Sequence, residues 1–353
     1  MKYLALGCMT LLGLACGGGG GDPAPSSNVN TTSANTTSAN TTTTTTANTI
    51  WEKISIAGSS ELIATRVVKD EASSNIYFSY NNLSGNAYKT SDLSTFTQTQ
   101  LNAGSHSIVR ADKRLFTFSS YSDDNGSTWT NFKDASNADV RFLTVDGSGN
   151  TLVGVNQITN QVYYSVNSGN TWASSNLNVV GSSSFLVDLT SHAAVKAQTV
   201  MIPHTSAGVF VSTQGGNNFT LKNVGLTNID VVASSGNSNS FFAGSKTGFF
   251  KTEDFGATWI SLTKASTSAT FNGWYALTVV SDDLIIGIIN YSSLGLINDS
   301  FDVVKSTNGG TTWTKMGSTF AMSMTSGIPS DVAVTSTHFL VNGSDTFFYK
   351  FKR

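Results

Sequence analysis

The most regularly placed carboxylates of this sequence sit in one short recurring pattern, Ser-x-Asp-x-Gly-x-Thr-Trp, which we call the box. Its clearest copy runs from Ser122 to Trp129. A carboxylate between hydroxyl groups is suited to general acid or base catalysis, as in the hydrolysis of glycosides. The same residue type recurs once per repeat, however, whereas a catalytic site needs an asymmetric placement. The pattern therefore indicates a structural role for Asp124 and its equivalents, and we nominate no catalytic residue.

The box recurs along the chain with drift. Its acidic or amide positions are Asp92 in a shortened copy, then Asp124, Asn167, Gln214, Asp254 and Asn308, and the aromatic positions of the full copies are Trp129, Trp172, Phe219, Trp259 and Trp313. A short turn between strands needs a side-chain oxygen to accept backbone N–H groups, a glycine at positive φ, and an aromatic side chain to pin the hairpin. We expect each box to be such a turn.

The box resembles the Asp-box, or BNR repeat, of sialidases, sortilin-type receptors, xyloglucanases and the photosystem II assembly factor family. All of these are β-propellers, and the resemblance covers residues 50–353. It implies an all-β fold, with the photosystem assembly factor-like group as the nearest relatives. It also implies that ligands bind at the face opposite the boxes, where second-to-third-strand loops and inter-blade connections gather.

Short strands separated by Gly and Asn turns fill each repeat, as in a propeller blade. One unit reads Arg141–Val145, Asn150–Val155, Gln161–Ser165 and Thr171–Ser174, and the next is expected to open with Phe185–Leu189. Trp51 to Ile54 resemble a fourth strand without its first three, whereas the C-terminus supplies three strands and no box. Joining both ends in one blade predicts seven blades. The short second unit, around Arg110 to Trp129, leaves six blades as the alternative.

Other reactive side chains are few. The only cysteines are Cys8 and Cys16, and the histidines stand alone, so the body of the protein offers no disulfide, thiolate or metal-ligand spacing, and we expect no metal or cofactor. In sialidases, which the repeat resembles, three arginines clamp a carboxylate beside a Tyr/Glu pair and an Asp. No arginine lies between residues 142 and 352, and Glu253 is inside a box. The residues favour a binding protein and leave an enzyme open.

The N-terminus carries an export signal. Lys2 precedes an apolar run from Tyr3 to Ala15, which is too short to span a bilayer and suits a signal peptide over residues 1–15. Leu12 to Cys16 resemble a bacterial lipobox, with Gly13 where that family prefers Leu. An ordinary signal peptide with an incidental cysteine is the alternative. Residues 16–49 then form a lipidated Cys16 and a Gly/Thr-rich linker, in which 11 of the 19 residues from Thr31 to Thr49 are Thr.

These features predict a location and a kind of partner. We expect an exported lipoprotein of the cell envelope, anchored to a bacterial membrane at the outer membrane or cell surface. The net charge of −2, with only 12% charged residues, excludes a basic nucleic-acid surface. We expect a monomer that binds a protein or a glycan as a binding or assembly module. A glycoside hydrolase or lyase of the sialidase-like superfamily is the alternative.

A candidate ligand face lies where two segments exceed the repeat. Asn290–Phe301 lengthens a loop between the second and third strands, and Gly317–Ser330 lengthens a connection between blades. Trp274, Tyr291 and Phe320 are the aromatic candidates for this face. Packing of Trp274 in the core, with the loops as neutral insertions, is the alternative.

Overall fold

The computed structural model describes most of the chain after residue 49. The described residues are 50–57, 63–69, 74–81, 86–100, 108–111, 114–117, 119–124, 127–146, 148–156, 158–178, 193–204, 208–222, 224, 226, 228–291, 300–321, 331–343 and 347–353. Residues Ala47–Arg353 form one compact unit. The signal peptide, Cys16 and the linker predicted from the sequence lie outside the described residues.

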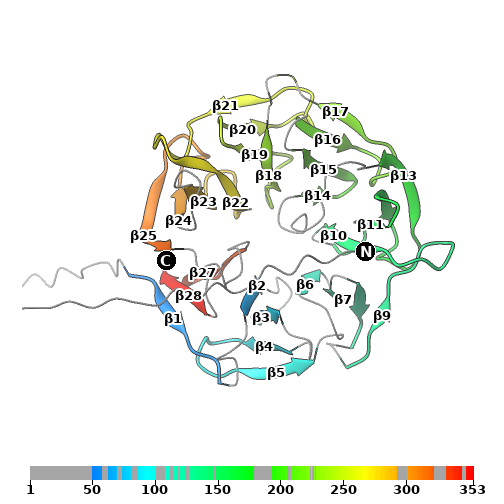
Figure 1. Cartoon of the computed structure of the whole chain (residues 1–353), viewed down its shortest axis with the longest axis horizontal. Coiled ribbons are helices and arrows are strands. Elements are labelled where there is room, and N and C mark those ends of the chain that lie inside the picture. Colours follow the sequence, from blue (N-terminus) through cyan, green and yellow to red (C-terminus); the bar gives the residue numbers. More distant parts are fainter. Residues whose placement is uncertain are drawn as a thin grey trace, which may run out of the picture. The chain divides into compact units, whose positions relative to one another are not determined.

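Seven antiparallel sheets of four strands each surround a central axis (Figure 1). Blades 1 to 3 are β2(Ile63–Lys69), β3(Ile76–Asn81), β4(Asn86–Thr90), β5(Thr97–Gln100); β6(Ile108–Ala111), β7(Arg114–Thr117), β8(Ser120–Ser122), β9(Thr130–Asn131); and β10(Arg141–Val145), β11(Leu152–Asn156), β12(Gln161–Ser165), β13(Ala173–Asn178). Blades 4 and 5 are β14(Ala194–Lys196), β15(Thr199–His204), β16(Gly208–Ser212), β17(Thr220–Lys222); and β18(Ile229–Ser234), β19(Phe241–Ser245), β20(Phe249–Thr252), β21(Ile260–Leu262). Blade 6 is β22(Phe271–Val279), β23(Ile285–Tyr291), β24(Ser300–Ser306), β25(Thr314–Ala321), and blade 7 is β26(Val332–Val334), β27(His338–Asn342), β28(Phe348–Lys352), β1(Glu52–Ile54).

This arrangement is an all-β, seven-bladed β-propeller, so the predicted fold class and the larger blade number are confirmed. The short second unit is a complete blade, β6 to β9. One predicted strand differs: the innermost strand of blade 4 is β14, whereas the predicted segment Phe185–Leu189 lies outside the described residues.

Blade 7 joins the two ends of the domain. β1 pairs antiparallel with β28, with Glu52 opposite Lys350 and Ile54 opposite Phe348. The Trp51 indole N–H also donates a 2.8 Å hydrogen bond to the Met316 carbonyl of blade 6. The first and last strands therefore close the ring together, as the sequence predicts, and β28 is covered along its outer edge.

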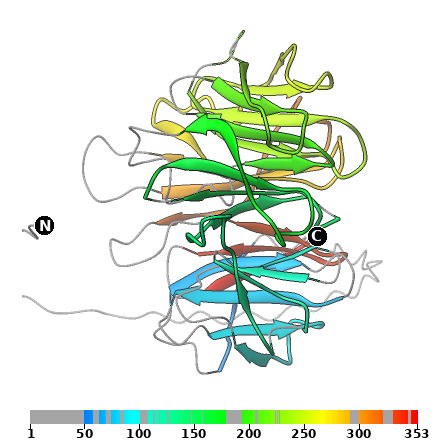
Figure 2. The ribbon, with the colours of Figure 1, turned by 90° about the vertical axis from the view of Figure 1, so that its right-hand side faces the viewer.

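The antiparallel order within each blade sorts the turns between two faces. The turn after the innermost strand and the box turn after the third strand lie at the same edge of a blade, whereas the loop after the second strand lies at the other. Figure 2 shows the sheets from the side, with their turns gathered at two opposite ends. We call the end with the first-strand turns and the boxes the box face.

Hydrophobic cores lie between neighbouring blades. Central strands such as β11 and β19 are buried along their whole length because each packs against sheets on both sides. One cluster joins Val155 of blade 3 to Ile202 of blade 4, and another joins Ile288 of blade 6 to Phe339 of blade 7. Each blade is thus stabilised by its two neighbours rather than by a core of its own.

Two truncations test the shared blade. Removing residues 17–49 leaves every described contact in place, so the unfolding transition should hardly move. Removing residues 17–58 also deletes Trp51 and β1, exposes the edge of β28 and should lower the melting temperature markedly or cause aggregation. Thermal unfolding of both proteins measures the difference. Equal melting temperatures would contradict a structural role for β1.

Candidate functional site

The box turns are held together by their own side chains. In blade 3, the Ser165 hydroxyl donates to Asn167 Oδ1 (2.8 Å) and accepts the Gly169 N–H (2.9 Å), while the Thr171 N–H donates to the same Oδ1 (3.0 Å). The box of blade 6 repeats this pattern from Ser306 to Thr312. The predicted turn chemistry of the box is therefore present in the structure.

Hydrogen bonds also account for the acidity of the box carboxylates. The backbone N–H and the hydroxyl of Thr128 lower the pKa of Asp124 to about 2, and those of Thr258 lower the pKa of Asp254 to about 2. The backbone N–H of Thr95 is the largest of several groups that lower the pKa of Asp92. These carboxylates are ionised and already bonded at neutral pH, which makes them poor proton donors.

The box glycines among the described residues bring their turns close to the preceding blade. Gly310 has a φ of +85°, and a Cβ there would lie 2.7 Å from the Phe249 ring of blade 5. Gly216 has a φ of +97°, and its Cβ would lie 2.8 Å from Cβ of Tyr164 in blade 3. Two constraints require glycine at these positions: the left-handed backbone conformation and the close approach to the neighbouring blade. The box therefore acts as a clamp between blades.

The aromatic box positions serve the same purpose. Trp172 and Phe219 are buried, each about 5% exposed, in clusters formed with the neighbouring blade. Trp129, Trp259 and Trp313 are partly buried against such clusters, and the Trp313 indole N–H donates to the Thr263 carbonyl (3.0 Å).

The box of blade 4 keeps the turn although Gln214 replaces the acidic residue. The backbone N–H groups of Gln214 and Gly216 both donate to the Ser212 hydroxyl.

Trp274 does not belong to a ligand face, contrary to one expectation from the sequence. It is 3% exposed and lies between Gly244 of blade 5 and Gly287 of blade 6, where added Cβ atoms would come within 2.9 and 2.2 Å of its ring. Its ring also stacks on Phe249 at 5.2 Å. Trp274 is a wedge between two blades, so the alternative of core packing describes it.

Tyr291 and Phe320 are partly buried and lie in different clusters. The Tyr291 hydroxyl approaches Ser266 Oγ at 3.5 Å beside the Trp274 cluster, whereas Phe320 stacks on Phe301 at 4.7 Å and contacts Trp51. The structure does not bring the three candidate aromatics together at one surface. Residues 292–299 and 322–330, in the extended loops, lie outside the described residues.

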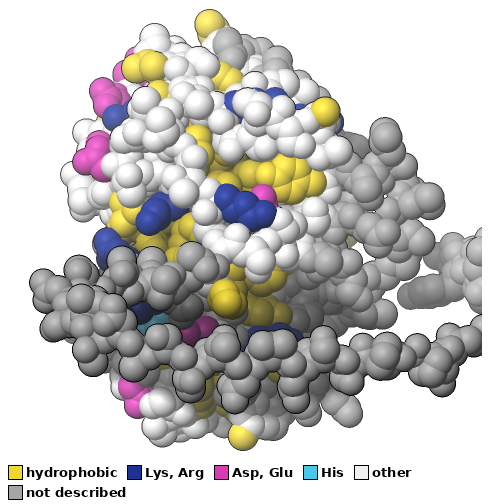
Figure 3. Space-filling model, turned by 90° about the vertical axis from the view of Figure 1, so that its left-hand side faces the viewer, with side chains coloured by type: hydrophobic (Ala, Val, Ile, Leu, Met, Phe, Trp, Pro, Cys, Tyr) yellow, Lys and Arg dark blue, Asp and Glu magenta, His cyan; other side chains and the backbone are white. Residues whose placement is uncertain are grey.

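The outer rim over blades 6 and 7 mixes basic and hydrophobic side chains. Figure 3 shows this side of the ring, with Lys and Arg side chains next to hydrophobic ones. Lys53 Nζ lies 4.0 Å from the centre of the Phe347 ring, and Lys350 pairs with Glu52 at 3.6 Å. Lys53 thus lies over two aromatic rings of the closing blade, those of Phe347 and Tyr349.

The axial channel and its mouth form a concave feature of the described residues. An inner cavity of about 250 Å³ is lined by innermost strands from β2 to β22, and it meets two hollows of about 710 Å³ each on the box face. Val145, Val195 and Ser234 line both the inner cavity and the first hollow, while Arg66 and Asp331 line both the inner cavity and the second. Val279 lines all three, so they form one continuous space.

A buried ion pair marks the wall of this channel. Arg66 Nε donates to Asp331 Oδ2 at 3.0 Å, and the two side chains are only 11% and 14% exposed. The pair links blade 1 to blade 7. Sequence reasoning did not predict this pair. An arginine on a strand that must line the propeller axis was a signal that could have indicated it.

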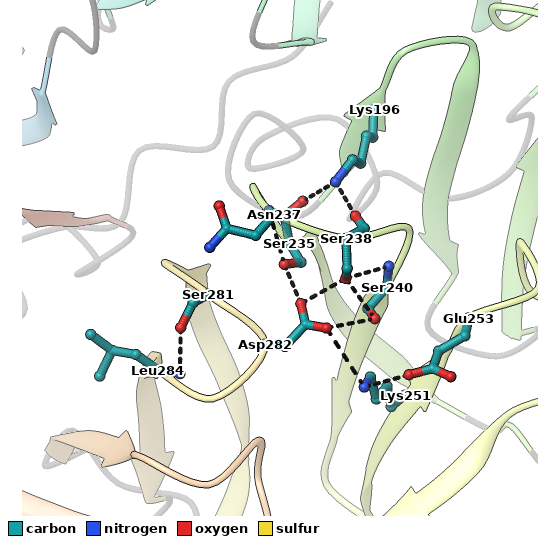
Figure 4. A network of polar contacts seen from close by, with 10 residues as sticks. All are labelled: Lys196, Ser235, Asn237, Ser238, Ser240, Lys251, Glu253, Ser281, Asp282 and Leu284. Carbon is teal, nitrogen blue, oxygen red and sulfur yellow. Dashed lines mark hydrogen bonds and ion pairs between the residues drawn. The ribbon is translucent and has the colours of Figure 1, made fainter.

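A polar network fixes the turns on the other side of the mouth (Figure 4). Lys196 Nζ of blade 4 donates to the carbonyls of Ser235 and Ser238 in the first turn of blade 5. Asp282 of blade 6 accepts the hydroxyls of Ser235 and Ser238 and lies 3.9 Å from Lys251 Nζ. Three consecutive blades are thus tied together at the box face, which makes this wall of the channel rigid.

The carboxylates that line the described hollows are already bonded. Asp146 accepts the N–H groups of Asn150 and Thr151, each at 2.9 Å, and Asp331 accepts Arg66 and its neighbour's N–H. Asp230, on the innermost strand of blade 5, is different: burial raises its pKa to about 7, although it accepts the Trp274 N–H at 3.1 Å. The described residues contain no cluster of groups suited to hold a metal and no helix able to cross a membrane.

The fold and this axial site define the chain as a seven-bladed β-propeller with a polar channel mouth. No family model matches the chain, and no curated protein matches it significantly. Among solved structures it is similar to YCF48 from Cyanidioschyzon merolae, with a TM-score of 0.59, 13% identity, and coverage of 86% of this chain and 98% of that one. A structure of YCF48 bound to D1 peptide gives a TM-score of 0.58, 10% identity, and coverage of 86% and 95%.

The chain is also similar to the GH74 xyloglucanase from Xanthomonas campestris. The TM-score is 0.57 at 13% identity, with 86% of this chain and 53% of that one covered. The chain thus spans about half the length of the xyloglucanase. At these identities the likeness shows a shared propeller fold, found both in a peptide-binding protein and in a glycoside hydrolase.

Alanine substitutions at two glycines test the clamp. Gly310→Ala should lower the free energy of unfolding by about 2 kcal/mol or more, because it strains the backbone and meets Phe249. Gly236→Ala should be nearly neutral, since its nearest neighbour would be 3.9 Å away. Denaturant unfolding of both variants gives the comparison, and equal destabilisation would refute the clamp.

Asp230 predicts a pH dependence of stability. Its folded pKa of about 7 lies above the ordinary value of 3.8, so between these values the folded protein holds a proton that the unfolded chain has lost. The free energy of unfolding should therefore fall as pH rises through this range. Asp230→Asn stays neutral, so its stability relative to the wild type should rise by up to about 4 kcal/mol between about pH 4 and pH 8. Asp139→Asn, at an exposed position, is the control, and parallel pH profiles for Asp230→Asn and the wild type would contradict the prediction.

Proposed function

We propose that this protein is an exported, lipid-anchored propeller of the Asp-box type that binds a segment of a partner protein at the box-face mouth of its channel. This is the face opposite to the one that the resemblance of the repeat implies, and the hollows of the described residues are the reason for the change. One observation carries this proposal. The mouth holds two hollows of about 710 Å³ each, lined largely by polar residues and backbone turns, and its carboxylates are already bonded. A surface of this kind holds a ligand without acting on it.

The size and lining of the mouth favour an extended polypeptide segment. Each hollow, at about 710 Å³, lies within the range of natural ligand sites. The first-strand turns that form the rim contribute backbone groups and small hydroxyl residues such as Ser148 and Ser235. Groups of this kind match the regularly spaced donors and acceptors of an extended main chain. The D1 peptide of the similar YCF48 structure supports the same class of partner.

Peptide and glycan arrays probed with the purified protein test this function. Binding to peptides, with none to glycans, is expected. Ser234→Tyr places a bulky group in the mouth and should weaken binding by about tenfold or more, which corresponds to about 1.4 kcal/mol. Ser261→Tyr, on the exposed outer strand β21, is the matched control. Selective glycan binding would replace the protein partner with a carbohydrate, and equal effects of the two variants would exclude the mouth.

A glycoside hydrolase or lyase is the second candidate, and one group favours it. The raised pKa of Asp230 keeps a carboxylic acid protonated near neutral pH, as a general acid requires. Turnover of xyloglucan and sialosides by the wild type, abolished by Asp230→Asn with the fold intact, would establish an enzyme. We expect no turnover, because Asp230 lies in the interface of blades 5 and 6. There it accepts the backbone N–H of Trp274 and lies close to Gly273, which leaves no room for a substrate.

The anchor is tested by the two cysteines of the leader. Cys16→Ser should release the protein from membranes, since lipid on this residue is proposed to be the only anchor. Cys8→Ser, within the segment that is removed, should leave the protein in the membrane fraction. Incorporation of radiolabelled palmitate and fractionation measure both effects. Membrane association of Cys16→Ser, or wild-type protein that takes up no label, would contradict lipid anchoring.

A further inference from the structure

A groove leads from the channel mouth to the edge of the ring along the junction of blades 1 and 7. The second hollow of the mouth shares Lys69, Thr335 and Ser336 with a further hollow of about 240 Å³, which reaches the Asp92 box and His338. We call this continuous path the seam groove. It begins at Arg66 on the axis and ends at the rim of the box face.

Basic side chains outnumber acidic ones along the seam groove. Arg66, Lys69 and Arg353 line its inner part, where Asp331 is the one acidic side chain. At its outer part the acidic side chain is Asp92, whose Oδ1 already accepts the N–H groups of Ser94 and Thr95. The excess of positive charge in a concave site focuses the local potential and favours an anionic ligand.

The guanidinium at the inner end is incompletely paired. Arg66 Nε bonds Asp331, but Arg66 Nη1 is buried with no hydrogen-bond partner, in a residue that is only 9% exposed. A buried donor without a partner carries a desolvation cost that a ligand can relieve. The fork of an arginine matches the two oxygens of a carboxylate, and Asp331 contributes one of its oxygens to this fork.

We infer that the seam groove binds an acidic peptide in extended form, with one carboxylate of the peptide seated at Arg66 and the chain leading outward past Lys69. The inference rests on the proposed function. It adds the charge of the bound peptide and the place on the propeller where the peptide lies. The peptide carboxylate competes with Asp331 for Arg66 and pairs with the donor that Asp331 leaves unused. Thr335 and Ser336 provide polar groups along the path.

The test uses fluorescein-labelled hexapeptides of sequence Gly-Ser-Ala-Asp-Ala-Ala, with the full chain in detergent and fluorescence polarisation as readout. Four probes combine a free or amidated C-terminus with Asp or Asn. Loss of both carboxylates should weaken binding by about tenfold or more, and the two single changes identify whether the chain end or the side chain supplies the group. Equal binding of all four probes would overturn the inference.

Two substitutions with opposite expected effects on affinity distinguish a ligand site from a structural ion pair. Arg66→Lys keeps the charge but loses the forked guanidinium, and it should weaken binding of the acidic probe by about tenfold. Asp331→Asn removes the competing carboxylate and should strengthen binding of the same probe several-fold. Lys69→Ala and Arg353→Ala should each weaken it by about threefold, in a salt-dependent manner. Lys133→Ala, an exposed lysine outside the groove, is the control.

Two outcomes would overturn the inference through the variants. One is weaker binding in Asp331→Asn as well as in Arg66→Lys, which would make the pair structural only. The other is an acidic probe that fails to saturate up to about 1 mM while arrays still detect peptide binding sensitive to Ser234→Tyr. That result would leave the proposed function standing and remove only the seam groove as its site.

Discussion

The contact between a box glycine and the preceding blade is the constraint on which the ring depends. A left-handed glycine such as Gly310 allows the turn to approach the Phe249 ring of the preceding blade within the space that a methyl group would fill. The Ser, Asp or Asn and Thr side chains stabilise that turn from within. Because the blades share their cores, the position of each turn sets the angle between two sheets, and the repeated angle closes the ring.

Most of the fold could be predicted from the sequence because the boxes recur at regular spacing and carry local information. The box residues specify their own turns, so the blade number and the joint blade of Trp51 and the C-terminus followed from counting. The start of blade 4 did not, because the apolar segment Phe185–Leu189 competes with Ala194–Lys196, and a strand of only three residues gives a weak signal. Local propensity cannot decide between two such segments.

The site was less accessible to sequence reasoning than the fold. Trp274 stands outside the register of the boxes, which made it a candidate for a ligand face, but two glycines on neighbouring strands leave room for its ring inside the protein. Arg66 and Asp331 are separated by 265 residues, and only the closed ring brings them together. A pair of this kind has no local spacing to reveal it, whereas each box is complete within eight residues.

Closure by both ends of the domain also orders the events of biosynthesis. The hydrogen bond from Trp51 to Met316 spans 265 residues, and β1 finds its partner only when β28 has been made. Contacts of such long range form late and slowly during folding. A chain that leaves the ribosome N-terminus first therefore cannot complete its ring until β28 has been made. The strands of the first six blades can pair before that point, whereas blade 7 depends on both ends of the domain.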